Sequence, residues 1–214
     1  MAEAVAGGNE EEVCVTDISC GSSHSVALLS CDVVASWGRG EDGQLGHGQA
    51  DECMTPKAIS TLTDAGIEHV VCGAEYTVAV APSRGQIYSW GWGDFGRLGH
   101  GDCNDVFVPR PIAFFTGRRV LRVACGDTHT LVVVATPGTP AAGGEGTANP
   151  LTATAAAAAG PGSGGGGGAG GELYTFGRNQ NGQLGLGHTH DCLSPQRVVA
   201  LQGERVVSVA AGSE

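Results

Sequence analysis

Tryptophans and charged side chains recur in the glycine-rich segments of this sequence, and together they suit recognition chemistry. Trp92 stands at a position that two other segments fill with Arg39 and Arg178. A planar cation or an indole beside carboxylates favours cation–π contacts and bidentate ion pairs. The candidate residues of this kind are the aromatics Trp37, Trp90 and Trp92 and the charged residues Glu41, Asp42, Asp94, Asp105 and Arg178.

Motifs for catalysis are missing from the sequence. It contains no G-x-x-x-x-G-K-S/T phosphate loop, no H-E-x-x-H zinc motif and no Ser–His–Asp arrangement. His24 and His129 recur with Tyr76 in a C-G-x-x-H/Y motif, and a repeated position favours a structural hydrogen bond. We therefore expect no enzymatic activity and no bound cofactor.

The composition limits the partners and the location. The formal net charge of −11 argues against direct binding to nucleic acid or to an anionic membrane surface, whereas carboxylates can hold a basic partner. No apolar run is long enough to span a bilayer. Residues 1–12 contain four glutamates and no basic residue, unlike a secretory or transit peptide. We expect the protein in the cytoplasm and nucleus.

The eight cysteines include no C-x-x-C pair and no tight cluster with histidine. Cys20, Cys72 and Cys125 instead return at regular intervals. This pattern favours reduced, half-buried thiols over disulfides or a zinc site.

Internal repetition is the strongest signal in the sequence. The segment S-W-G-R-G-E-D-G-Q-L-G-H-G at 36–48 returns as S-W-G-W-G-D-F-G-R-L-G-H-G at 89–101 and as T-F-G-R-N-Q-N-G-Q-L-G-L-G at 175–187, in steps of 53 and 86 residues. The same two steps separate the prolines Pro56, Pro109 and Pro195. Landmarks that share one period indicate tandem structural units.

The longer second step has a visible cause in the composition. Residues 136–171 are largely Thr, Pro, Ala and Gly, and they can bury too little apolar surface to offset the entropy of ordering. We predict a disordered insertion there, inside a hairpin loop, and a disordered acidic N-terminus at 1–12. Segments 13–135 and 172–214 are predicted to be the repeats, the last of them truncated partway through the next unit.

Short apolar or β-branched runs bounded by glycine-rich turns lie between these landmarks and predict β-strands. They occupy 25–29, 33–37, 67–72, 77–81, 87–90, 120–125, 130–135, 173–176 and 206–210. A period near 52 residues with four short strands predicts the blades of an all-β propeller. Leu45, Leu98 and Leu184 would then lie in the inter-blade core, and the repeated proline would start an outer strand.

The motifs W-G-x-G-x-x-G-Q/R-L-G-x-G and C-G-x-x-H/Y-T resemble the repeats of the regulator-of-chromosome-condensation family. Kelch propellers have a similar period but carry a Gly-Gly doublet in each repeat, which is absent here. The resemblance covers about 13–135 and 172–214. It implies a propeller that closes with seven four-stranded blades, of which about three are present.

Within this family, the segments at 25–30, 35–48, 88–101 and 177–187 look like those of plant and green-algal UV-B photoreceptors. The resemblance implies that intrinsic tryptophans absorb the light in place of a bound chromophore. It also implies that the full-length protein forms a homodimer, held by arginine–carboxylate pairs that light breaks. The monomer would bind an E3 ubiquitin ligase of light signalling, and an indirect association with chromatin stays open.

Carried over residue by residue, the resemblance makes the three tryptophans antenna or interface aromatics. The interface charges that it implies are Glu41, Asp42, Asp94, Asp105 and Arg178. The sequence departs from the receptors at Phe176, where they have a tryptophan, and at His190, where they have an acid. The G-W-R-H-T motifs with the principal chromophores, and the tail that contacts the ligase, would lie beyond Glu214.

Two other functions remain alternatives. A guanine-nucleotide exchange factor for a Ran-type GTPase would be expected to carry a structured insertion and basic chromatin-binding segments, and 136–171 predicts neither. The other alternative is a generic propeller interaction module. In that case Trp37 and Trp90 pack between blades, and the charged residues form a solvated rim.

Overall fold

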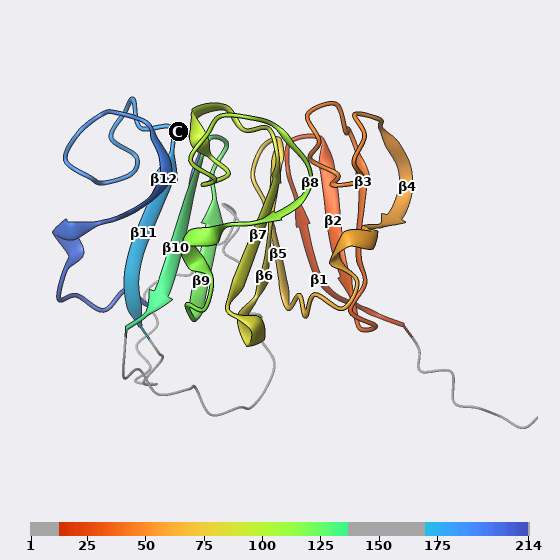
Figure 1. Ribbon diagram of the computed structural model, residues 1–214, viewed down its shortest axis with the longest axis horizontal. Coiled ribbons are helices and arrows are strands. Elements are labelled where there is room, and N and C mark those ends of the chain that lie inside the picture. Colours follow the sequence, from red (N-terminus) through yellow and green to blue (C-terminus); the bar gives the residue numbers. More distant parts are fainter. Residues whose placement is uncertain (1–12, 137–169, 214) are drawn as a thin grey trace, which may run out of the picture.

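The computed structural model describes residues 13–136 and 170–213, which form three four-stranded antiparallel sheets in a row (Figure 1). The first sheet contains β1 (Val15–Cys20), β2 (His24–Leu29), β3 (Val34–Gly38) and β4 (Cys53–Ala58). The second contains β5 (His69–Cys72), β6 (Tyr76–Ala81), β7 (Gln86–Gly91) and β8 (Val106–Pro111). The third contains β9 (Val120–Cys125), β10 (His129–Ala135), β11 (Gly171–Gly177) and β12 (Cys192–Arg197).

Each sheet follows the chain order from one edge to the other, and this meander is the blade of a propeller. The predicted fold class, an all-β propeller with about three blades present, is confirmed. Short 3-10 turns connect the strands, and among the described residues no helix has the length and apolar character to cross a membrane. We call the sheets blades one, two and three.

The predicted insertion falls between two paired strands of blade three. Strands β10 and β11 pair without interruption from His129 opposite Gly177 to Ala135 opposite Gly171. The chain therefore leaves and re-enters the same hairpin around the Ala- and Gly-rich tract. Residues 1–12 and 137–169, with the predicted disordered N-terminus and most of the predicted insertion, lie outside the described residues.

The prediction that the repeated proline starts an outer strand is wrong in its detail. Pro56 is the fourth residue of β4, and Pro109 and Pro195 take the same place in β8 and β12. Pairing of β4 with β3 shifts register between Ser36 and Gly38. A proline, which lacks an N–H, is tolerated at such an irregularity on an edge strand.

The strand predicted at 206–210 does not form. Val206 makes an isolated bridge with Gly171, through N–H···O bonds of 3.1 and 3.0 Å, and residues 207–210 have no regular structure. An apolar run becomes a strand only where a neighbouring strand supplies partners along its length, and the described residues provide one partner position.

The repeated leucines are buried in the core, as predicted, and Leu98 belongs to the apolar cluster that blades two and three share. Leu45, Leu98 and Leu184 are each 1% exposed. A side-chain hydroxyl on the third strand fixes the turn that carries each leucine, since Ser36, Ser89 and Thr175 donate to the carbonyl oxygens of Leu45, Leu98 and Leu184. The repeat thereby holds its buried leucine in the same way three times.

The first glycine of the L-G-H-G motif makes room for an aromatic ring of the following blade. Gly46 has φ +74°, and a Cβ there would come within 2.8 Å of Trp90 Nε1. Gly99, with φ +75°, lies equally close to the ring of Phe176. At both junctions, the one between blades one and two and the one between blades two and three, the glycine and the aromatic side chain therefore fit as a pair.

Replacing Gly46 by alanine is expected to destabilise the chain more than the matched change Gly185→Ala. Both glycines occupy the same repeat position with positive φ, 74° and 68°, but the nearest atom to a Cβ at 185 is 3.7 Å away. Both substitutions therefore strain the backbone to a similar extent. The clash with Trp90 adds about 1 kcal/mol or more to the loss of unfolding free energy at position 46. Urea unfolding of the two variants measures the difference, and equal losses would contradict the pairing of Gly46 with Trp90.

Candidate interaction face

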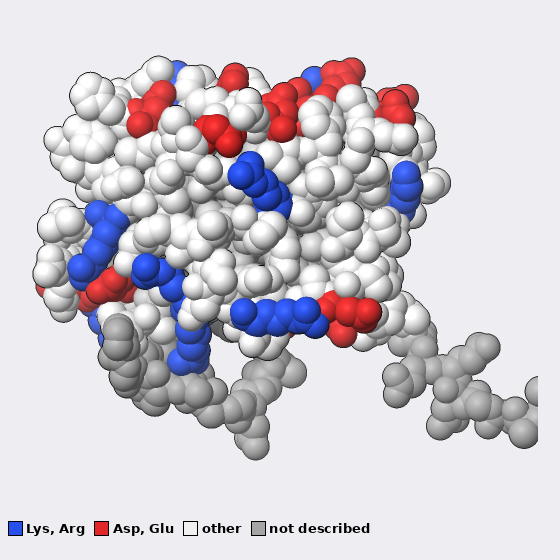
Figure 2. Space-filling model, viewed as in Figure 1, with Lys and Arg blue, Asp and Glu red and all other residues white. Residues whose placement is uncertain are grey.

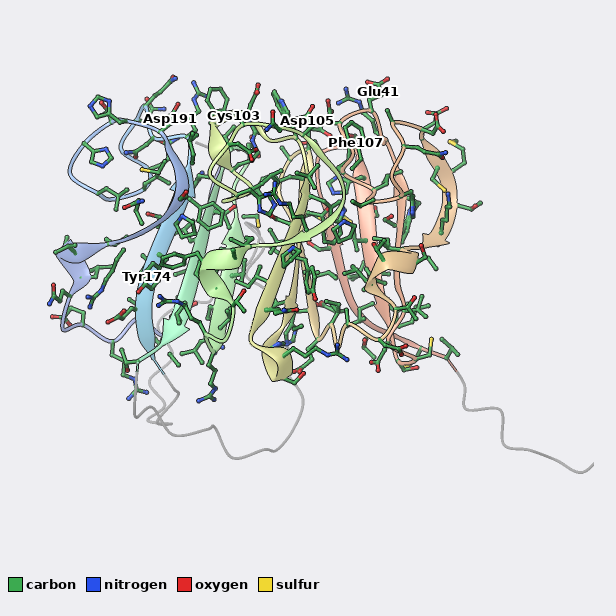
Figure 3. The ribbon with its side chains drawn as sticks, viewed as in Figure 1. Glu41, Cys103, Asp105, Phe107, Tyr174 and Asp191 are labelled. Atoms are coloured by element: carbon green, nitrogen blue, oxygen red, sulfur yellow. The ribbon has the colours of Figure 1, made fainter. Side chains whose placement is uncertain are left out.

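The loops that join the third and fourth strands gather at one end of all three blades. Glu41, Asp105 and Asp191, one from each blade, all lie at that end (Figure 3). In the same view, carboxylates crowd this end, whereas most lysine and arginine side chains lie lower (Figure 2). We call this end the acidic face; the candidate charged residues and Trp92 lie in its loops.

Trp92 rests on a buried arginine. The guanidinium carbon of Arg97 lies 4.1 Å from the centroid of the indole and 5.5 Å from that of Phe95. Arg97 is 0% exposed, Trp92 is half-buried, and burial lowers the pKa of the guanidinium. Cation–π contact in a desolvated place is stronger than at the surface, so the indole is held firmly at the rim.

Arg97 is also tied to the neighbouring blade. Its Nε donates to the carbonyl of Asp94 at 3.0 Å, and its Nη1 donates to the carbonyl of Asp127, in blade three, at 3.2 Å. Nη2 has no hydrogen-bond partner among the described residues. The pair of Trp92 and Arg97 thus sits over the junction between blades two and three.

Arg178 comes to the same junction from blade three. Its guanidinium carbon lies 5.3 Å from the Phe95 ring, and its Nη2 donates to Gln180 Oε1 at 2.9 Å. Phe95 itself adopts φ +61°, a region that costs a non-glycine residue about 1–3 kcal/mol. The strained turn presents the ring between the guanidinium groups of Arg97 and Arg178.

The junction between blades one and two carries a carboxylate cluster around Arg39. Glu41 Oε2 accepts hydrogen bonds from Arg39 Nε at 3.0 Å and Nη2 at 2.6 Å, and Asp42 lies 3.3 Å from Nη1. Glu75 of blade two lies 3.6 Å from the same arginine and accepts from Gln44 Nε2 at 2.8 Å. Glu41 and Asp42 are therefore paired within the chain.

The predicted interface acids of blade two differ in their surroundings. Asp105 Oδ1 accepts the backbone N–H of Gly93 at 2.8 Å, and Asp191 does the same for Asn179. This repeated bond braces the loop, so Asp105 has a structural task beside any contact with a partner. Asp94 is exposed at the start of the turn η3 (Asp94–Gly96).

The tryptophans are not equivalent in position. Trp90 is 0% exposed between blades one and two, and its Nε1 donates to the carbonyl of Gln44 at 2.9 Å. Trp37 is half-buried on β3. Trp92 alone of the three lies among the loops of the acidic face.

Glu75 contacts Arg39 at the junction between blades one and two, and Arg97 lies at the junction between blades two and three, but neither was among the predicted site residues. Aligning the repeats would have exposed them: Glu75 matches Ser23 and Thr128, and Arg97 stands where two repeats have Gln44 and Gln183. A charged residue at a position that is neutral in sister repeats was the available signal.

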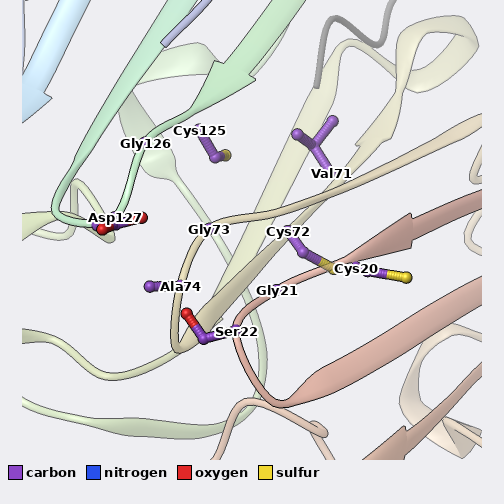
Figure 4. Close-up of a pocket in the computed structure, with 10 residues that line it drawn as sticks. All are labelled: Cys20, Gly21, Ser22, Val71, Cys72, Gly73, Ala74, Cys125, Gly126 and Asp127. Carbon is purple, nitrogen blue, oxygen red and sulfur yellow. The ribbon is translucent and has the colours of Figure 1, made fainter. Parts of the chain in front are cut away.

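A cavity of about 250 Å³ lies where the first strands of the blades end (Figure 4). Its lining includes Cys20, Cys72 and Cys125, one from each repeat. Burial raises the pKa of Cys72, and it raises that of Cys125 to about 12, so these two thiols are poor nucleophiles. Residues 13–136 and 170–213 contain no cluster of three or more side chains that could hold a metal ion.

Four-stranded blades, junctions built from repeated motifs and a charged loop face define a repeat β-propeller that presents a protein-interaction surface. The family model described as the regulator of chromosome condensation (RCC1) repeat matches residues 34–80, 84–133 and 170–214, and a second model of the same repeat matches 15–44. The chain belongs to the RCC1 repeat family.

Two curated relatives illustrate the range of proteins that this chain is similar to. It is 47% identical to the ultraviolet-B receptor UVR8 of Arabidopsis thaliana, over 92% of this chain and 37% of that protein. It is 36% identical to the E3 ubiquitin-protein ligase HERC2 of Homo sapiens, over 93% of this chain and 3% of the ligase. The chain therefore spans little more than a third of the receptor's length and a small part of the ligase.

Solved structures agree on the fold. Prp20p from Saccharomyces cerevisiae superimposes with a TM-score of 0.68 at 20% identity, over 93% of this chain and 42% of that one. Human WBSCR16 gives a TM-score of 0.65 at 21% identity, over 97% and 44% of the two chains. At such low identity these likenesses support the propeller architecture alone.

Proposed function

We propose that these repeats belong to a UV-B photoreceptor-type propeller that signals by switching between a homodimer and a monomer. The observation that carries the proposal is Trp92, which is stacked on the buried Arg97 at the rim of the acidic face. The 47% identity to an ultraviolet-B receptor supports the same function. Intrinsic tryptophans would take the place of a bound chromophore.

The acidic face offers both halves of a self-complementary contact. Arg178 supplies a half-buried cation, and Asp94 supplies an exposed carboxylate on the neighbouring blade. In a two-fold symmetric dimer each such cation meets the other copy's acids. Glu41 and Asp42 are held by Arg39 within the chain and contribute less. By likeness to the receptor, the monomer would then bind an E3 ubiquitin ligase in the cytoplasm and nucleus.

Replacing Arg178 by alanine is expected to weaken self-association of the full-length protein about tenfold, equal to ~1.4 kcal/mol. The loss follows because carboxylates across the interface would remain desolvated without a cation. Size-exclusion chromatography in low and high salt, with and without UV-B, measures the change. The matched control is Arg84→Ala, which removes the same charge from the turn η2 (Pro82–Arg84), away from the acidic face.

Each outcome separates the candidate functions. A dimer that dissociates under UV-B and in high salt supports the photoreceptor. A salt-sensitive dimer that ignores UV-B favours the generic interaction module, and a single size under every condition rejects the dimer altogether. If Arg178→Ala and Arg84→Ala weaken self-association equally, the dimer interface does not lie on the acidic face.

A further inference from the structure

One loop of the acidic face contains the only Asn-Gly sequence of the chain, Asn181-Gly182. Asn181 is exposed. Asn179, two residues earlier, is 0% exposed, donates to the carbonyl of His188 at 2.8 Å and accepts from the N–H of Leu184 at 3.0 Å. The loop therefore contains one buried asparagine and one exposed asparagine.

The glycine after Asn181 has open space beside its Cα, and its backbone nitrogen makes one hydrogen bond. Gly182 has φ +77°, and a Cβ placed on it would meet nothing within 4 Å. Its N–H donates to the carbonyl of Asn179 at 2.9 Å. Breaking one hydrogen bond of this kind costs about 0.5–1.5 kcal/mol, so the contact slows a reaction at this nitrogen without preventing it.

Blade one shows what an acid at this position does. Its loop has the same length and carries Asp42-Gly43 at the equivalent place, with Gly43 at φ +82°. The backbone N–H of Asp42 donates to Gln44 Oε1 at 3.0 Å, as that of Asn181 does to Gln183 Oε1. Asp42 lies 3.3 Å from Arg39 Nη1, and the equivalent of Arg39 is Arg178.

We propose that Asn181-Gly182 is a site of spontaneous deamidation, and that the aspartate formed at 181 pairs with Arg178 as Asp42 pairs with Arg39. The Gly182 nitrogen loses its proton to water and attacks the side-chain carbonyl carbon of Asn181. The amide nitrogen takes a proton back from water, its bond to the carbonyl carbon breaks and ammonia leaves, which gives a cyclic imide. Water then opens the imide to aspartate or, through the other bond, to isoaspartate.

The product changes the charge of the acidic face. One neutral amide becomes a carboxylate, so the net charge goes from −11 to −12. A carboxylate in the same chain would compete with one from a partner for Arg178. This last consequence rests on the proposed function, whereas the modification itself does not.

The modification is tested on the chain incubated in mildly alkaline and in mildly acidic buffer. Peptide mass spectrometry is expected to find the mass gain of an amide-to-acid conversion at residue 181 and none at Asn179, faster in the alkaline sample. Isoelectric focusing is expected to show a growing acidic band that migrates with Asn181→Asp. Absence of the gain at 181 in the folded chain, or an equal gain at Asn179, overturns the proposal.

Two variants serve as controls for the chemistry. Gly182→Ala crowds the attacking nitrogen, and Asn181→Gln lengthens the side chain so that a larger ring must close; both are expected to lose the acidic band. Because alanine is strained at positive φ, the glutamine variant decides if Gly182→Ala does not fold. A band that persists in Asn181→Gln would place the reaction elsewhere.

The ion pair is tested separately in Asn181→Asp. The carboxyl pKa of residue 181, measured by NMR titration, is expected to lie below the ordinary value of aspartate and to return to it when Arg178→Ala is added. If the pKa does not change on Arg178→Ala, residue 181 does not pair with Arg178. The deamidation itself is tested separately by the mass measurement. Neither readout depends on dimer formation.

Discussion

Replacing Trp90 by alanine is expected to lower the free energy of unfolding by about 3–5 kcal/mol. The indole is 0% exposed and belongs to the apolar cluster shared by blades one and two, with Val26 and Val70. Its removal leaves a cavity that the neighbouring strands cannot fill. The loss also deprives the Gln44 carbonyl of one of its two donors, the other being Thr77 Oγ1.

Two variants control this measurement. Trp37→Ala removes the same side chain from the equivalent place in blade one, where it is half-buried, and is expected to cost clearly less. Trp90→Phe reproduces the ring that Phe176 provides in blade three and is expected to keep most of the packing. Urea unfolding with an unchanged m-value makes the comparison. Losses of equal size in Trp90→Ala and Trp37→Ala would refute the structural role of Trp90.

Acidification from pH 6.5 to about 4 is expected to remove about 3 kcal/mol of stability through His24 alone. Burial lowers the pKa of this imidazole from 6.5 to about 4. The ring lies at the junction of blades one and two, where its Nε2 is bonded to Thr77 Oγ1 at 2.9 Å. In that pH window the unfolded chain binds a proton that the folded chain does not. The contribution of His24 to the free energy of unfolding is therefore fully present above pH 6.5 and is lost as the pH falls toward 4.

The substitution His24→Tyr isolates this effect. Blade two already has a tyrosine at the position, and Tyr76 bonds Thr130 as His24 bonds Thr77. The variant is expected to show a shallower fall in unfolding free energy over the same pH range. A smaller slope remains, because burial also lowers the pKa of His129, His100 and His47. Identical pH profiles for the two proteins would exclude His24 as the source.

The sequence was sufficient to predict the propeller, because strand, turn and junction residues return together. A leucine that returns at the same place in each repeat has the same surroundings in each blade, so Leu45, Leu98 and Leu184 could be predicted to lie in the core. The run 206–210 was read as a strand from its own composition, although pairing decides whether a strand forms. The predicted place of the prolines at the start of a strand was wrong for a similar reason. The register shift that accommodates them arises from the pairing of two strands and cannot be seen in the sequence of one.

The geometry of the acidic face could be predicted only in part. Motif spacing placed Trp92 and Arg178 in equivalent loops, but the stacking of Trp92 on Arg97 depends on the path of a long side chain across a junction. The contact of Arg39 with Glu75 likewise joins two repeats and has no copy between blades two and three, where Thr128 replaces the glutamate. Deviations from the repeat, rather than the repeat itself, distinguish the two junctions.

The pairing of Gly46 with Trp90, and of Gly99 with Phe176, bears on how such a protein can grow in evolution. Blade two contributes the ring of Trp90 to one junction and Gly99 to the other, so this single unit contains one half of both contacts. A tandem duplication of one unit in the gene would create a new junction whose two halves already fit. Blade number can therefore change in one genetic event, whereas a larger side chain in place of a junction glycine requires a second substitution that makes the facing ring smaller.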